Sequence, residues 1–155
     1  MSAAGGPYLF DVGVIALAHT DAPVRDAALS YVRDAITGDI DAVVPYSAVF
    51  GAHTVLTTYY GRSNADASRL LQNFMDAKRI HWYGELSETV VRGGLSRAGD
   101  ANGGGWDGYY AQVAIAEGVN TVLTIDDDFE RFDAFETEVI LSPEEFSELN
   151  RYLGN

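Results

Sequence analysis

Short apolar runs alternate with amphipathic segments along almost the whole chain. The runs that predict strands lie at residues 8–11, 41–46, 79–83, 120–125 and 136–142. Between these runs, apolar residues recur at the spacing of a helix. Because strands separated by helices cannot pair as tight hairpins, the alternation predicts an α/β fold with a parallel sheet and helices on both of its faces.

Capping residues indicate where the helices begin and end. The predicted helices occupy residues 23–37, 48–60, 64–77, 86–98, 107–117 and 143–153. Pro23 suits a first helical turn, Gly38 suits the position after a helix end, and Ser47 is predicted to cap the second helix. Residues 99–106 (GDANGGGW) are predicted to form a flexible loop that leads into Asp107.

A length of 155 residues fits one domain, which we expect to span residues 7–153 after a flexible N-terminus at residues 1–6. The apolar runs are far shorter than the roughly 20 residues that span a membrane, and residues 1–6 lack the regions of a signal peptide. The sequence has no cysteine, which excludes disulfides and thiolate metal sites. We therefore expect a cytoplasmic protein with no membrane partner.

The charge of the chain is strongly acidic. It has 23 acidic and 10 basic residues, a formal net charge of −13, and Lys78 as its only lysine. Such a composition favours a halophilic source, where the surface must stay hydrated in concentrated salt. A charge of −13 would normally argue against a nucleic-acid partner, but at ~1 M salt the Debye length is about 3 Å. Net charge therefore does not exclude RNA.

Acidic residues recur where predicted strands end. Asp11 follows the first strand, and Asp126 to Asp128 follow the fourth. Asp107 begins the helix that leads to the fourth strand. If the first and fourth strands are neighbours, these carboxylates meet at one edge of the sheet and require a cation. Oxygen ligands favour Mg²⁺ or Mn²⁺ over Zn²⁺, and such ions assist phosphodiester hydrolysis.

Each acid also has a structural explanation. Asp107 would serve as a helix N-cap, and Asp126 to Asp128 would form a solvated turn. Asp11 is harder to explain in this way, because it directly follows an apolar strand. The acids are more informative together than singly.

The segment WDGYYAQVAIAEGVNTVLTIDDDFERF, residues 106–132, resembles the PIN domain family. An acid-led helix, a glycine turn, an apolar strand and Thr-x-Asp-x-Asp-Phe follow one another in both, and Thr124, Asp126, Asp128 and Phe129 supply the last motif. The resemblance extends from Tyr8 to about Leu141. The family comprises Mg²⁺-dependent ribonucleases and includes the VapC toxins of toxin–antitoxin pairs.

The resemblance assigns roles to these residues. Asp11, Asp107 and Asp126 match the acids that hold the metal, and Asp128 matches an acid that assists them. Thr124 would support the cluster from behind. The implied fold is a three-layer α/β/α arrangement of a central parallel five-stranded sheet with strand order 3-2-1-4-5.

The resemblance also implies an activity and partners. It predicts a Mg²⁺- or Mn²⁺-dependent endoribonuclease that hydrolyses RNA, acts as the toxin of a VapBC-type pair, binds a cognate antitoxin protein and forms a homodimer. RNA-processing members of the family share the same acids, so that role stays open.

Two departures from the family motif support an alternative. Val12 and Gly13 follow Asp11 where the family has Thr or Ser and then Asn, and His53 falls at the position matched to a family Glu. Imidazole is a poor ligand for Mg²⁺ and a better one for Mn²⁺. His53 would ligate Mn²⁺, donate to a phosphate or act as a base. The alternative is a catalytically weak, degenerate PIN-like module that binds RNA or protein.

Further candidates carry less weight. Arginines that could contact RNA phosphates are Arg62, Arg92, Arg97 and Arg131, and surface ion pairs are the competing explanation. Apolar residues that could form either a dimer surface or part of the core are Val55, Leu56, Leu70, Leu71 and Phe74. A phosphoacceptor protein is disfavoured, because Lys78 precedes the third strand whereas that class requires a late lysine.

Overall fold

The computed structural model describes residues 6–154. Residues 1–5, which make up most of the predicted flexible N-terminus, lie outside the described part of the chain. The strands are β1 (Tyr8–Phe10), β2 (Ala42–Pro45), β3 (His81–Tyr83), β4 (Thr121–Thr124) and β5 (Glu136–Val139). All four neighbouring pairs are parallel and the strand order is β3-β2-β1-β4-β5, which confirms the predicted sheet.

The strand order creates a switch point between β1 and β4. The chain moves outward from β1 to β2 and β3, and then returns to add β4 and β5 on the other side of β1. In parallel α/β sheets, ligands commonly bind at the carboxyl ends of the strands that meet at such a switch point. In the register of the sheet, Phe10 lies beside Leu123, and the Asp11 amide donates to the Leu123 carbonyl at 3.0 Å.

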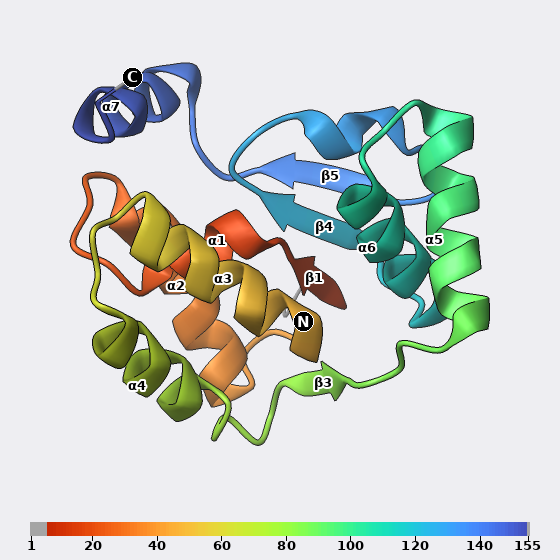
Figure 1. Ribbon diagram of the computed structural model, residues 1–155, viewed down its shortest axis with the longest axis horizontal. Helices are drawn as coiled ribbons and strands as arrows, with labels where there is room; N and C mark the ends of the chain where they lie inside the picture. The colour runs from red at the N-terminus through yellow and green to blue at the C-terminus, as the bar shows by residue number, and fades with distance from the viewer. Residues whose placement is uncertain (1–5, 155) are drawn as a thin grey trace.

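Seven α-helices and one 3₁₀-helix surround the sheet in the described part of the chain. The helices are α1 (Val12–Ala18), α2 (Arg25–Thr37), α3 (Tyr46–Thr58), α4 (Asn64–Phe74), α5 (Glu88–Ala101), α6 (Gly105–Ala116), η1 (Asp128–Arg131) and α7 (Pro143–Tyr152). Figure 1 shows α1 to α4 grouped on one side of the molecule and α5 paired with α6 on the other, with the sheet between the two groups. This arrangement agrees with the predicted three-layer α/β/α fold.

Several predicted boundaries agree with the structure. Gly38 follows α2 with φ at +84°, a conformation that glycine adopts without strain. Pro143 begins α7, where Ser142 and Glu145 form a reciprocal capping box. Helix α4 begins at Asn64, as predicted, and Ser63, which was not predicted to cap it, accepts from the Asp66 amide.

Other predicted boundaries are wrong. Pro23 lies in a turn outside α2, because Val24 at φ +60° separates it from the helix. Ser47 lies inside α3, whose N-cap is Pro45, so the strand passes into the helix without a capping side chain. The predicted loop at residues 99–106 belongs mostly to α5 and α6, and only residues 102–104 connect them. Helix α1 was not predicted.

The apolar residues of α3 and α4 contribute mainly to the core. Leu56, Leu71 and Phe74 are buried, and Val55 packs against them from a partly buried position. One core cluster joins buried residues from β1 through α7. Leu56, Leu71, Phe74 and Val55 therefore support the core explanation, whereas Leu70 is partly buried and does not belong to the core cluster.

No helix among residues 6–154 is both long enough and apolar enough to cross a lipid bilayer. The longest described helix, α5, has 14 residues.

Two glycines set the close contact between α5 and α6. A Cβ atom on Gly108 would lie 2.2 Å from the Gly94 carbonyl oxygen and 2.7 Å from the Ala98 Cβ. A Cβ atom on Gly94 would lie 2.9 Å from the Tyr109 Cα. Only residues without side chains allow the two backbones to approach so closely. This contact positions the first turn of α6, which contains Asp107.

Candidate active site at the β1–β4 switch point

Asp11 lies at the end of β1 and faces Thr124 at the end of β4. The Thr124 hydroxyl is buried and donates to Asp11 Oδ2 at 3.2 Å, and the Asp126 amide donates to the same hydroxyl oxygen at 3.4 Å. One threonine therefore joins the segments that follow two neighbouring strands.

Asp126 and Asp128 continue from β4 toward the same edge of the sheet. The Asp128 amide donates to Asp126 Oδ1 at 3.0 Å, which holds the turn into η1. Asp126 is half-buried and Asp128 is exposed. The predicted solvated turn therefore describes Asp127 and Asp128 better than Asp126.

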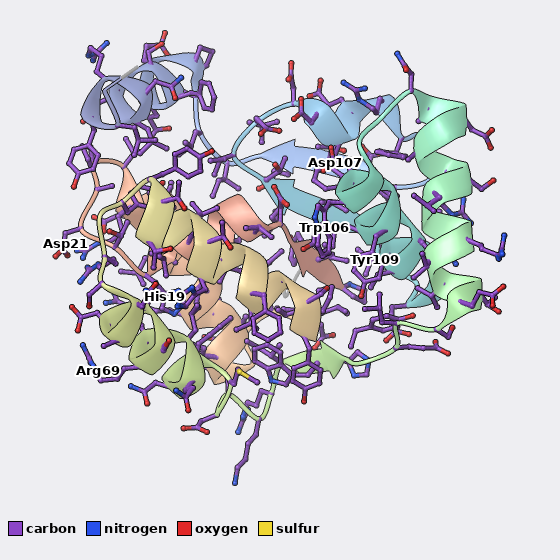
Figure 2. All side chains as sticks on the ribbon, viewed as in Figure 1. His19, Asp21, Arg69, Trp106, Asp107 and Tyr109 are labelled. Carbon is purple, nitrogen blue, oxygen red and sulfur yellow. The ribbon has the colours of Figure 1, made fainter. Side chains whose placement is uncertain are left out.

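Asp107 is the third residue of α6 and does not cap it. Gly104 occupies the N-cap position, and no side chain caps the helix. Instead, the Asp107 carboxyl group is half-buried, and repulsion from Asp128 and Asp126 adds to the rise of its pKa that burial causes. Figure 2 shows Asp107 at the end of α6 that lies nearest β4 and β5. The capping explanation for Asp107 is therefore wrong.

The acids raise one another's pKa values. Burial raises the pKa of Asp11 from 3.8 to about 7, with repulsion from Asp126 and Asp107 adding to the effect. Burial also raises the pKa values of Asp107 and Asp126, with a further contribution from the charge of Asp128. Perturbed carboxyl groups gathered at a switch point are typical of functional sites.

Arg131 is the cation that the structure places beside these acids. Its Nε donates to the Asp128 carbonyl at 3.0 Å, and its Nη1 donates to the Asn102 carbonyl. The guanidinium lowers the pKa of Asp107, but this effect is smaller than the effects of burial and of the neighbouring carboxylates. The acids therefore keep an unbalanced negative charge.

The donor set fits a hard divalent cation only in part. Carboxylate oxygens suit Mg²⁺ or Mn²⁺, and the buried Ser47 hydroxyl near Tyr110 has no well-formed hydrogen bond. However, among residues 6–154 no three acid or histidine side chains stand close enough together to hold one ion. Mg²⁺ commonly binds through one or two carboxylates and keeps several waters. The residues present fit that mode of binding.

The structure does not bring His53 to the acids. Its Nε2 lies 3.2 Å from Ser68 Oγ, and its ring lines a cavity between α3 and α4. The face of α3 toward Asp11 carries Gly51 instead, because a Cβ atom there would lie 2.8 Å from Val12. Residues two positions apart in a helix, as Gly51 and His53 are, lie about 200° apart around its axis. His53 therefore points away from Asp11. The prediction that His53 belongs to the acidic site is therefore wrong.

The four predicted RNA-binding arginines lie in different places. Arg62 pairs with Asp21 at 3.6 Å, and Figure 2 shows Asp21 on the opposite side of the molecule from Asp107. Arg92 pairs with Glu88 at 2.7 Å on the exposed face of α5. For these two residues the ion-pair explanation holds.

Arg97 and Arg131 lie closer together. Both line a cavity of about 300 Å³ beside the end of α5, and Arg97 donates to Gln112 Oε1 at 2.7 Å. Of the four arginines, Arg131 is the one in electrostatic contact with the acidic cluster.

Three residues that lie around the acids are assigned no role at the acidic site by the sequence analysis. Tyr110 is buried with its hydroxyl close enough to Asp11 that the carboxylate adds to the rise of its pKa, after burial. Ser47 is predicted as a helix cap but lies inside α3, and Trp106 falls within the predicted loop at residues 99–106 but belongs to α6. The position of Trp106 directly before Asp107 was the available signal.

Comparisons with known proteins give no assignment. No protein-family model matches the chain, and a search of curated proteins finds no match either.

The high pKa of Asp11 predicts a pH dependence of stability in the metal-free protein. The unfolded chain releases this proton near pH 3.8, whereas the folded protein keeps it up to about pH 7. The free energy of unfolding therefore falls as the pH rises between these values and is lowest above them. Asp11→Asn should remove this pH dependence. Its free energy of unfolding should therefore exceed that of the wild type by up to about 4 kcal/mol at about pH 8, and by little at about pH 4.

Denaturant unfolding of both proteins with a chelator present, at high salt to screen exposed acids, measures this difference. Parallel pH curves for the wild type and Asp11→Asn would contradict the prediction.

Proposed function

We propose that this chain is a Mg²⁺- or Mn²⁺-dependent endoribonuclease of the PIN type. The observation that carries the proposal is the gathering of Asp11, Asp107 and Asp126 around the β1–β4 switch point with raised pKa values. A divalent cation would supply the missing positive charge. The family resemblance then supports RNA as the substrate.

The positions of the side chains support the following proposed roles. Asp11 and Asp126, joined through Thr124, would hold the ion, and Asp107 would contribute from the first turn of α6. The bound ion would polarise a phosphate oxygen and lower the pKa of a water molecule. Asp128, which is exposed beside Asp126, would accept the proton of the attacking water. The water would add to phosphorus as the bond to the leaving ribose oxygen breaks, and solvent would supply the proton that this oxygen takes up.

A degenerate binding module is the second candidate. No described group of three side chains could hold an ion as it stands, and apolar Val12 packs against Gly51 beside Asp11. A pocket with few direct ligands would bind a cation weakly. A protein of this kind would bind RNA or a partner protein without cutting.

The biological role is a finer proposal. We infer a toxin of the VapBC type, with a cognate antitoxin and a homodimeric state, from the resemblance alone. A small DNA-binding protein encoded next to this chain would distinguish the toxin role from an RNA-processing role.

Metal removal tests the activity. With a labelled, unstructured RNA, we expect cleavage in Mg²⁺ or Mn²⁺, no cleavage in excess chelator, and recovery when the ion is restored. His53→Ala should cleave like the wild type, because His53 contacts Ser68 and not the acids. Cleavage that persists in chelator would contradict the proposal, and RNA binding without cleavage in either metal would favour the binding module.

A further inference from the structure

Trp106 is an exposed aromatic side chain next to the candidate active site. It directly precedes Asp107 in the first turn of α6, and 62% of its surface is exposed. Figure 2 shows Trp106 and Asp107 on the part of α6 that faces the strands. Because burying an indole is favourable, a tryptophan left in solvent at this place suggests a binding role.

The indole is held in place by two buried tyrosines. It stacks on Tyr110 with ring centres 6.0 Å apart and an interplanar angle of 23°, and it meets Tyr109 edge-on at 6.0 Å. Both tyrosines are at least 90% buried. A ring supported in this way loses little conformational freedom when a ligand binds.

Trp82 shows how this protein uses a structural tryptophan. Its ring stacks on Tyr46 at 5.5 Å and packs edge-on against Phe74, and its Nε1 donates to the Ala77 carbonyl at 2.9 Å. Among residues 6–154, no hydrogen bond is found for the indole of Trp106, and most of that ring is open to solvent. The fold does not require Trp106 in the way that it requires Trp82.

The charge of the chain restricts how it could hold RNA. The net charge is −13, and several of the few arginines are already paired with acids, namely Arg25, Arg62, Arg69 and Arg92. Proteins that rely on phosphate contacts use many free cations. Here, uncharged contacts must supply a large part of the affinity, and stacking of bases on aromatic rings is the strongest such contact.

We propose that Trp106 is a stacking platform for an unpaired base of single-stranded RNA, beside the phosphate that the acids would act on. This inference rests on the proposed function, which identifies the bound nucleic acid as RNA. A base within a duplex is already stacked on both faces and cannot reach the indole, so the preferred substrate is unpaired. Because a base has a π-face whatever its identity, the platform tolerates different sequences.

Binding without cleavage tests this proposal. A labelled, unstructured RNA and the same sequence annealed to its complement are titrated in excess chelator, with tryptophan fluorescence and anisotropy as readouts. We expect single-stranded RNA to quench Trp106, Trp106→Ala to weaken binding about tenfold to a hundredfold, and Trp106→Phe to retain most of it. Tyr59→Ala is the matched control, because Tyr59 is 61% exposed at the far end of α3.

Several outcomes would overturn the proposal. One is equal RNA binding by Trp106→Ala and the wild type. Another is equal affinity of the wild type for the duplex and for single-stranded RNA. A third is conversion of a dimer to a monomer by Trp106→Ala, which would make Trp106 a subunit contact. Binding through Trp106 without metal-dependent cleavage would support the platform while refuting the nuclease. Metal-dependent cleavage with full activity in Trp106→Ala would support the nuclease while refuting the platform.

Discussion

Asp126→Asn should reduce metal-dependent RNA cleavage by roughly 10²- to 10³-fold without destabilising the protein. Asn keeps the shape of the side chain and can still accept from the Asp128 amide, which lies 3.0 Å from Asp126 Oδ1. It removes the negative charge that would attract the cation. Because burial and neighbouring acids raise the pKa of Asp126, a neutral side chain also relieves repulsion in the metal-free fold.

The variant should therefore lose activity and gain thermal stability in chelator, a combination that general unfolding cannot produce. Asp127→Asn is the matched control, because it makes the same charge change at the neighbouring residue, whose side chain is exposed. It should keep most of the activity. Equal losses in both variants would indicate a general charge effect and contradict the assigned role of Asp126.

Gly108→Ala should destabilise the protein by about 3 kcal/mol or more and greatly reduce its activity. The added methyl group would stand 2.2 Å from the Gly94 carbonyl oxygen, a backbone atom that cannot move without shifting α5. The overlap outweighs the gain of about 1 kcal/mol that alanine brings to a helix. Since Asp107 is the preceding residue, separating α5 from α6 would also displace this acid.

Gly99→Ala provides the control within the same helix pair. In the described part of the chain, no atom lies within 4 Å of the position that a Cβ atom on Gly99 would occupy in α5. This variant should be more stable by about 0.5–1 kcal/mol and fully active. Thermal and denaturant unfolding distinguish the two variants, and a Gly108→Ala protein as stable as the wild type would show that the helices can separate without cost.

The alternation of strands and helices was readable from the sequence because it depends on local patterns. Apolar runs such as Val122-Leu123 predict buried strands wherever they occur, and Gly38 ends a helix through its own conformation. The strand order came from the family resemblance, and the structure agrees with it.

The errors occurred where packing decided the outcome. Ser47 has the chemistry of an N-cap, but β2 passes directly into α3 and places it inside the first turn. His53 was matched to a family Glu by its position along the chain, and that position cannot tell which face of α3 meets Asp11. The contact between Gly51 and Val12 settles that question, because only small residues let the two helices approach there.

The sequence by itself determined the parallel α/β class, the acidic composition and the placement of acids at strand ends, since each depends on residue type and short-range periodicity. The tertiary structure alone decided which acids share one edge, that His53 faces α4, and that Trp106 stands exposed beside Asp107. Those facts depend on contacts between residues as far apart as Asp11 and Thr124, and local patterns hold no information about such distances.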